Sequence, residues 1–200
     1  MLASIHPLGE RGRGNRWGIT FAAHLLASAV AGGLLGAALG TLGGAVRHWL
    51  GPVPTLSVAV AACAAGIVFE LGLGGVALPT VHRQVDRAWL DRYRGWVYGA
   101  GFGFQLGLGV ATIVTTAAVY LTFVLALVQA SLLGGAVVGA TFGAVRAATL
   151  IAAASVRQPG QLHVLHQALD RWKPRMRRSV VGVEGLAAMA ALLAVAGAAG

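Results

Sequence analysis

Long apolar blocks separated by short polar connectors dominate the pattern of this sequence. Five blocks stand out, at about residues 19–46, 56–78, 97–128, 132–154 and 180–199. Each has about the 20 residues that an α-helix needs to cross a hydrocarbon core. Their apolar positions neither alternate, as in barrel strands, nor recur on one helix face, as in a soluble bundle. The pattern predicts an all-α integral membrane protein, a bundle of about five transmembrane helices.

Composition agrees with this prediction. Hydrophobic residues make up 57% of the 200 residues, charged residues only 10%, and the mean hydropathy is +0.76. A soluble domain has roughly 25% charged residues, so a soluble enzyme is excluded. The formal net charge of +9 would suit a nucleic-acid partner, but the basic residues flank apolar blocks instead of lining one soluble face. The expected partner of most of the surface is therefore the lipid bilayer.

The basic residues are distributed unevenly between the connectors. Thirteen of the fifteen Lys and Arg residues lie before the first block, between the second and third, and between the fourth and fifth. Positively charged connectors remain in the cytoplasm. The distribution therefore predicts an N-in, C-out topology in the cell (inner or plasma) membrane, with an odd number of spans. High Arg, Ala and Gly usage indicates a bacterial source.

The first apolar block divides the chain into a tail and a membrane domain. Its apolar stretch is about twice the length of a signal-peptide core, roughly 7–15 residues, so we expect it to be retained as a span. Residues 1–18 are then a cytoplasmic N-terminal tail, and residues 19–200 form a polytopic transmembrane domain.

Two connectors have the pattern of interfacial amphipathic helices. Val81, Val85, Trp89 and Trp96 recur near every fourth residue among arginines and aspartates. A second segment begins at Pro159, places Leu162, Leu165, Leu169 and Trp172 on one face, and is expected to stop at Pro174. Aromatic and basic side chains of this kind anchor a protein at the lipid headgroups. Docking of a cytoplasmic partner is the alternative.

Glycines recur every fourth residue in three blocks. Such spacing lets helix backbones approach closely in lipid, where the hydrophobic effect no longer drives helix association. We therefore predict helix-packing faces at Gly32, Gly36, Gly40 and Gly44, at Gly99, Gly103 and Gly107, and at Gly135, Gly139 and Gly143.

The third block has features of a kinked or broken helix. Glycines crowd residues 101–109, threonines follow at 112, 115 and 116, and the block is longer than one span needs. Broken helices in transporters expose backbone groups to a substrate path. The run also has the form of a GxGxxG motif, but it follows no strand, which excludes a nucleotide site.

Few polar side chains lie inside the blocks. Glu70, Gln105 and Arg146 each lie eight residues from the cytoplasmic end of their predicted span, about 12 Å deep at 1.5 Å per residue. An isolated charge there costs about 3 kcal/mol, so we expect Glu70 and Arg146 to meet. They either line a path for a small solute or a proton, or form a structural ion pair. His24 and Glu184 are accessory polar candidates nearer the cytoplasmic boundary.

No residue pattern indicates catalysis, a cofactor or a metal. His163, His166 and Asp170 resemble half of a metal site, but the chain has no second ligand cluster. The single cysteine, Cys63, is interpreted as a small apolar residue. We therefore predict no enzyme activity.

Residues 101–152 resemble the second half of the transmembrane domain of the CcdA/DsbD-type family, which carries reducing equivalents across bacterial membranes. The resemblance is carried by Gly101-Phe102-Gly103-Phe104, the following Leu106-Gly107, a threonine-containing kink and a glycine-spaced helix. It implies a broken-helix carrier scaffold. The family has Cys-Pro at the break, where this chain has Gly109-Val110-Ala111-Thr112, and it has six spans. Thiol chemistry is therefore not carried over.

Two functions remain open. The first is a small-solute carrier or permease subunit whose path is lined by Glu70, Gln105 and Arg146. The second is a non-transporting scaffold, assembly factor or accessory subunit that docks a partner through its basic cytoplasmic loops. Because five spans enclose a path mainly by oligomerising, a homo-oligomer or a membrane-protein partner is expected in either case.

Overall fold

The computed structural model describes residues 5–72, 88–109, 117–154 and 159–199, and its regular structure is helical throughout these ranges. The elements are α1 (Pro7–Gly12), α2 (Trp17–Leu50), α3 (Pro52–Leu71), α4 (Ala88–Arg92), α5 (Gly95–Gly107), α6 (Ala118–Val128), α7 (Leu132–Ala148), the 3₁₀ turn η1 (Thr149–Ala153) and α8 (Pro159–Ala199). The all-α class predicted from the sequence is confirmed.

Four helices in the described ranges are long and apolar enough to cross a membrane. They are Trp17–Leu50, Pro52–Leu71, Leu132–Ala152 and Gln167–Ala198. At 1.5 Å per residue each is at least as long as a hydrocarbon core of about 30 Å. α5 and α6 are both shorter than this, and together they occupy the third apolar block.

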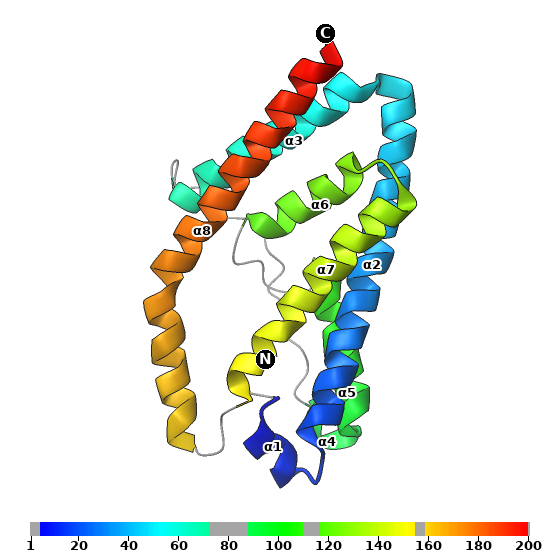
Figure 1. Ribbon diagram of the computed structural model, residues 1–200. Coiled ribbons are helices and arrows are strands. Elements are labelled where there is room, and N and C mark those ends of the chain that lie inside the picture. The colour runs from blue at the N-terminus through cyan, green and yellow to red at the C-terminus, as the bar shows by residue number, and fades with distance from the viewer. Residues whose placement is uncertain (1–4, 73–87, 110–116, 155–158, 200) are drawn as a thin grey trace.

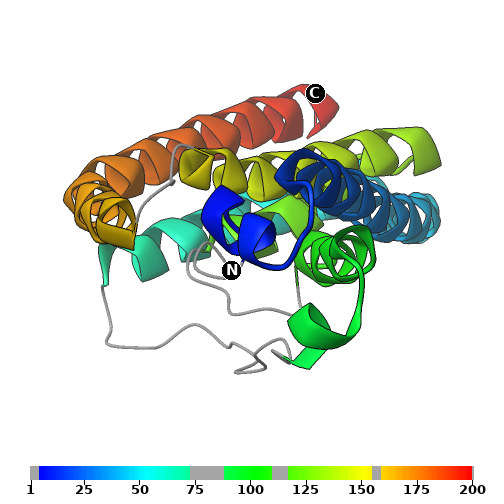
Figure 2. The same cartoon turned by 90° about the horizontal axis from the view of Figure 1, so that it is seen from below.

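The centre of the molecule is a three-helix unit of α2, α5 and α7 (Figures 1 and 2). A Cβ added at Gly36 would overlap the carbonyl oxygen of Gly135 and lie 3.0 Å from the Cα of Gly139. Gly99, Gly103 and Gly107 of α5 likewise lie against the backbone of α2, the last two against His24 and Ser28. Only glycine, whose side chain is a single hydrogen atom, allows these backbones to come so close.

The glycine contacts also give the directions of the helices. From Gly99 to Gly107, α5 advances along α2 from Thr20 to Ser28, so the two helices are parallel. From Gly135 to Gly143, α7 runs back along α2 toward Ser28 and is antiparallel to it. In α2 the last close contact is made by Gly43, which lies against Leu127, whereas Gly44 is less crowded.

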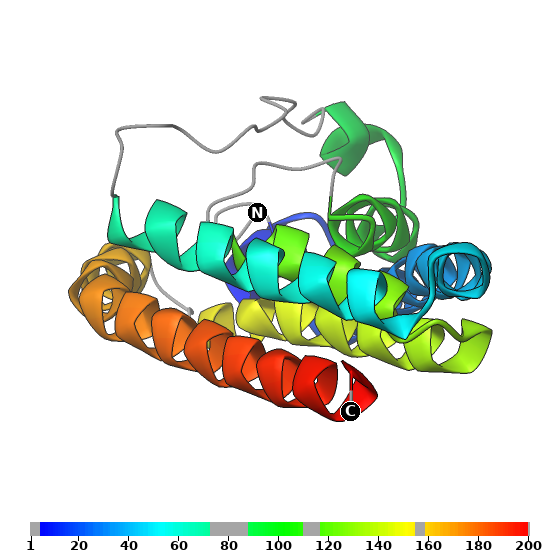
Figure 3. The same cartoon turned by 90° about the horizontal axis from the view of Figure 1, so that it is seen from above.

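The second unit is the pair of α3 and α8, which lie side by side (Figure 3). A Cβ on Gly66 would lie 2.8 Å from the Oε1 atom of Glu184, so the helices touch at this point. Large apolar side chains along the rest of α8 are exposed, among them Leu186, Met189 and Leu193. Those side chains are available to lipid or to a partner.

One predicted boundary is wrong at α8. We expected Pro174 to stop an interfacial helix before the last span, but α8 is a single 41-residue helix that contains Pro174. Proline removes one backbone hydrogen bond and bends a helix without having to end it. Figure 1 shows this helix changing direction near its middle.

Other boundaries moved for local reasons. α3 ends at Leu71, short of the predicted residue 78, because Gly72 adopts a left-handed C-cap with φ of 71°. α2 extends the first predicted span at both ends, to Trp17 and Leu50. Of the first predicted interfacial segment, Val81 and Val85 lie outside the described residues, and α4 contains Trp89.

The N-terminal tail is folded onto the membrane domain. Ile5 is fully buried in a small apolar cluster with Tyr98, Phe102 and Leu150. Trp17 and Phe21 stack on each other beside this cluster, with ring centroids 5.1 Å apart. Residues 5–18 therefore close one end of the α2–α5–α7 unit instead of extending away from it.

Candidate functional site

The third apolar block is interrupted inside the fold. α5 ends at Gly107, and the next described helix, α6, begins at Ala118. Gly109 has a φ of 70°, a left-handed conformation that glycine adopts without strain. A Cβ there would also lie 2.7 Å from the Phe123 ring of α6. Residues 110–116 lie outside the described residues. The interruption leaves two helix ends whose backbone groups need partners.

Glu70 provides a partner for one of these ends. Its Oε1 atom accepts a hydrogen bond of 2.8 Å from the backbone N–H of Ala117, the residue that caps the start of α6. The N-terminus of a helix has unpaired N–H groups and a partial positive charge. The Glu70 carboxylate of α3 accepts one of these N–H groups and its negative charge interacts favourably with the partial positive charge. Glu70 therefore acts as an N-cap supplied by another helix.

Arg146 provides a partner for the other end. Its Nη1 atom donates a 3.2 Å hydrogen bond to the carbonyl oxygen of Leu106, in the last turn of α5. That carbonyl also accepts the N–H of Gly109, so the guanidinium occupies its second lone pair. A cation at a helix C-terminus interacts favourably with the helix dipole. The guanidinium carbon also lies 5.5 Å from the centroid of the Phe142 ring.

The predicted polar layer is thus divided between two helix ends. Glu70 bonds to the beginning of α6, and Arg146 bonds to the end of α5. The ion pairs within the described residues are Arg13–Glu10 and Lys173–Asp170, so Glu70 and Arg146 are not joined directly there. The half-buried Gln105 side chain makes no hydrogen bond within the described ranges.

The two accessory candidates are both buried. His24 is fully buried on α2, and its Nδ1 lies 3.2 Å from the carbonyl oxygen of Gly99. One turn further, Ser28 donates a 2.8 Å hydrogen bond to the carbonyl oxygen of Gly143. These side chains join α2 to α5 and α7 and reinforce the glycine contacts. Glu184 is 1% exposed and packs against Gly66 of α3.

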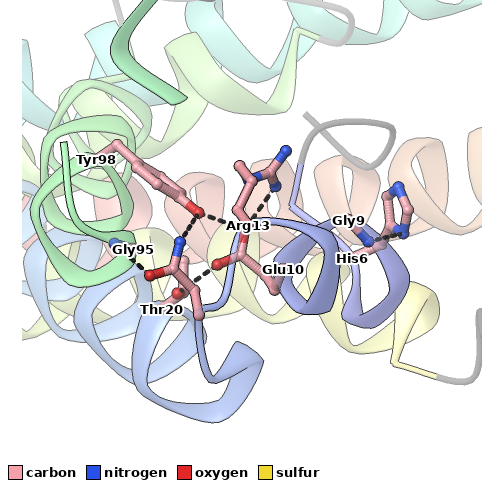
Figure 4. A network of polar contacts seen from close by, with 8 residues as sticks. His6, Gly9, Glu10, Arg13, Thr20, Gly95 and Tyr98 are labelled. Atoms are coloured by element: carbon pink, nitrogen blue, oxygen red, sulfur yellow. Dashed lines mark hydrogen bonds and ion pairs between the residues drawn. The ribbon is translucent and has the colours of Figure 1, made fainter. Parts of the chain in front are cut away.

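A polar network at the N-terminal end was not found from the sequence (Figure 4). At its centre is the fully buried Glu10 of α1. Its carboxylate accepts hydrogen bonds of 2.7 Å from Arg13, 2.8 Å from the Thr20 hydroxyl and 2.5 Å from the Tyr98 hydroxyl. Such charge-assisted bonds are stronger than neutral ones. They bind α1 to α2 and α5.

Asn15 extends the network to the first turn of α5. Its amide nitrogen donates a hydrogen bond of 3.2 Å to the Tyr98 hydroxyl. Its amide oxygen accepts a hydrogen bond of 3.3 Å from the N–H of Gly95, one of the donors that a helix N-terminus leaves unpaired. The one feature that could have pointed to this network is an acidic residue at position 10 in a basic tail. Its partner Tyr98 is 88 positions away, so no local pattern links them.

The spaces between helices differ in size. Where α2, α6 and α7 meet, the cavity is about 10 Å³, close to the space of a single water molecule. A surface groove of about 600 Å³ lies between α6 and α7, with Arg146 and Thr149 among its mostly apolar lining. No group of three or more metal-binding side chains occurs in the described part of the chain, and the side chains of His163 and His166 lie outside it.

The chain has a relative among known proteins. No family model matches the chain, and no solved structure matches it. The chain is similar to the methylamine utilization protein MauF of Methylophilus methylotrophus, with 29% identity over 205 residues. The match covers 99% of this chain and 66% of the relative, so the chain spans just under two thirds of the length of MauF. Its similarity to a methylamine utilization protein therefore extends over its whole helical region.

Proposed function

We propose that this chain is a non-transporting accessory protein of the bacterial inner membrane, and that it serves a system for the utilization of small amines. The observation that carries the proposal is how the two charged side chains of the apolar blocks are bonded. Glu70 and Arg146 are each bonded to one end of an interrupted helix. Charges engaged in this way stabilise the fold, whereas a carrier needs groups that exchange their partner for a solute.

Close packing of the central unit supports the same function. The α2–α5–α7 contacts are made backbone to backbone, and the cavity beside them holds about 10 Å³. A solute path through this unit would need helices that move apart. Similarity to MauF, whose name ties that protein to methylamine utilization, extends over 99% of this chain and supports the biological setting.

We propose five crossings, with the N-terminus in the cytoplasm and α5 and α6 together as the third. α5 runs parallel to the beginning of α2, and the end of α6 at Leu127 reaches Gly43 near its other end. The two short helices therefore progress in one direction beside a full-length span. This interruption falls within the residues that resemble the CcdA/DsbD-type family, and it supports a broken-helix scaffold without thiol chemistry.

A carrier is the second candidate because of the groove between α6 and α7. Its volume of about 600 Å³ lies within the range of small-molecule sites, roughly 300–1,000 Å³. Arg146 at its edge would attract an anion. The same groove, bordered by the exposed Val137 and Val145, equally suits a transmembrane helix of a partner or of a second copy.

Growth and flux measurements separate the two functions. Deletion of the gene should abolish or slow growth on methylamine as the nitrogen source and leave growth on ammonium unchanged. Purified protein in liposomes should then give methylammonium and proton fluxes equal to those of empty liposomes. A flux that the protein raises, and that Arg146→Met abolishes, would establish the carrier instead. Normal growth of the deletion strain on methylamine would overturn the amine-utilization role.

A further inference from the structure

A second cavity lies where the end of α3 meets the middle of α8. Its volume is about 590 Å³, and among the described residues it is lined by Leu71 of α3 and by Lys173, Pro174, Arg177, Arg178 and Val181 of α8. Three of the six lining residues are cationic, and the other three are apolar. Neither Glu70 nor Arg146 is among these lining residues.

Of the three cationic side chains that line the cavity, those of Arg177 and Arg178 are available to bind a ligand. Lys173 forms a 2.7 Å ion pair with Asp170. Within the described part of the chain, the side chains of Arg177 and Arg178 have neither an ion-pair nor a hydrogen-bond partner. Both residues are exposed. The guanidinium groups therefore present free donors of the kind that bind phosphate.

The cavity also lies at the edge of the apolar zone in both helices. α3 has no charged residue before Glu70 and ends at Leu71, while α8 has none except Glu184 after its basic run ends at Arg178. Gly66 and Glu184, which contact each other, lie about one turn further into the apolar side of each helix. The basic run of α8 and the end of α3 thus meet where the uncharged part of each helix ends.

Lipid rather than free phosphate fits this combination. A soluble phosphate would use only the guanidinium groups, whereas a phospholipid places its headgroup beside Arg177 and Arg178 and its acyl chains along Leu71 and Val181. Exposed aromatic and basic residues next to the cavity, including Trp172 with Arg175 over its ring at 5.7 Å, are typical of the headgroup level.

We propose that the cavity between the end of α3 and residues 173–181 of α8 is a binding site for the headgroup of an anionic phospholipid, with Arg177 and Arg178 as its phosphate ligands. Basic pockets between membrane helices on the cytoplasmic side bind anionic headgroups in this way. The site rests on the membrane location proposed above and is independent of the accessory role.

The test is native mass spectrometry of the full chain in a neutral detergent. Phosphatidylglycerol and phosphatidylcholine with identical acyl chains are titrated separately, and the bound fractions are compared. We expect the wild-type chain to favour phosphatidylglycerol roughly tenfold or more, since each basic residue near an anionic headgroup contributes roughly fivefold. The double variant R177Q/R178Q should lose this preference, and each single variant should lose roughly fivefold of it.

A matched pair of substitutions provides the control. R171Q/R175Q removes the same charge from the same helix, at residues that do not line the cavity, and should keep most of the preference. Equal losses in both double variants would overturn the site in favour of diffuse attraction. Absence of a wild-type preference would overturn it as well. Displacement of the lipid by millimolar inorganic phosphate would show that free phosphate is the ligand, and would contradict the lipid assignment.

Discussion

The two helical units of this molecule hold together in different ways. In the α2–α5–α7 unit, backbones touch along three rows of glycines, and buried polar side chains such as His24 and Ser28 add bonds across the interface. In the α3–α8 pair, contact is made at points such as Gly66 against Glu184, and most of α8 is exposed. One unit is held by backbone contact along its length, whereas the other is held at fewer points; both present exposed apolar side chains to lipid or a partner, such as Val137 on α7 and Leu186 on α8.

The difference shows how close packing replaces the hydrophobic effect in lipid. Leucine-rich surfaces gain nothing from contact with each other when lipid tails solvate them equally well, so association depends on van der Waals fit and hydrogen bonds. The α2–α5–α7 unit meets both conditions. We therefore expect substitutions in this unit to cost far more than equivalent substitutions in α8.

The largest expected effect comes from adding one methyl group to a glycine row. Gly36→Ala places a Cβ onto the carbonyl of Gly135, so α2 and α7 must separate. This should lower the free energy of unfolding by about 3 kcal/mol or more. Gly182→Ala on α8 is the matched control, because nothing lies within 4 Å of its Cβ position. It should be neutral or stabilise by up to about 1 kcal/mol.

Denaturant titration of both variants in micelles measures these values. Equal destabilisation by the two substitutions would mean that α8 is packed as closely as α2, and would remove the contrast between the units.

The buried network at the N-terminal end gives the next largest effect. Glu10→Ala leaves Arg13, Thr20 and Tyr98 without their shared acceptor. We expect it to cost about 3 kcal/mol of unfolding free energy, since removing one partner of a buried charge network strands the others. Arg11→Ala, an exposed neighbour on the same helix, should change stability by less than about 0.5 kcal/mol. A negligible effect of Glu10→Ala would show that α1 is not part of the closed unit.

A smaller effect is expected at the N-cap of α1. The Nδ1 atom of His6 accepts a 3.1 Å hydrogen bond from the N–H of Gly9, which only the neutral ring can do. Partial burial and the nearby Arg13 lower the pKa of His6 below its ordinary 6.5, although Glu10 opposes this. The stabilisation is therefore present above pH 6.5 and is lost as the pH falls through the lowered pKa of the folded state.

This cap should contribute on the order of 0.5 kcal/mol. Thermal unfolding between pH 7.5 and 5 should show the loss in the wild type, and His6→Ala should remove that part of the pH dependence. If the variant keeps the full pH dependence, His6 does not cap the helix through its ring.

Much of the fold followed from sequence pattern because apolar length and glycine spacing are local signals. Gly32, Gly36 and Gly40 could be placed on one face from their spacing, and the structure has them against α7. Long-range polar contacts could not be placed in this way. Glu10 lies in the segment predicted to be a cytoplasmic tail, and its partner Tyr98 is 88 positions away. Pro174 was expected to end a helix that it bends instead.

The interrupted third block was the most informative case. Glycines and threonines predicted a break there. The free-energy cost of an isolated charge in the membrane predicted that Glu70 and Arg146 would have partners. Because Glu70 and Arg146 had the same predicted depth in the membrane, each was expected to be the partner of the other. The unpaired backbone groups at the ends of a broken helix are an alternative source of partners, and depth in the membrane does not reveal them. Both side chains bond to such groups in the structure.

A double-mutant cycle at Glu70 and Arg146 tests this assignment most directly. Unfolding free energies are measured in micelles for Glu70→Gln, Arg146→Met and the double variant. If the two side chains stabilise different helix ends, each single substitution costs about 1–2 kcal/mol and the costs add to within about 0.5 kcal/mol. A coupling energy of about 2 kcal/mol, with the double variant no less stable than the single ones, would instead show a direct ion pair and contradict the capping of the broken helix.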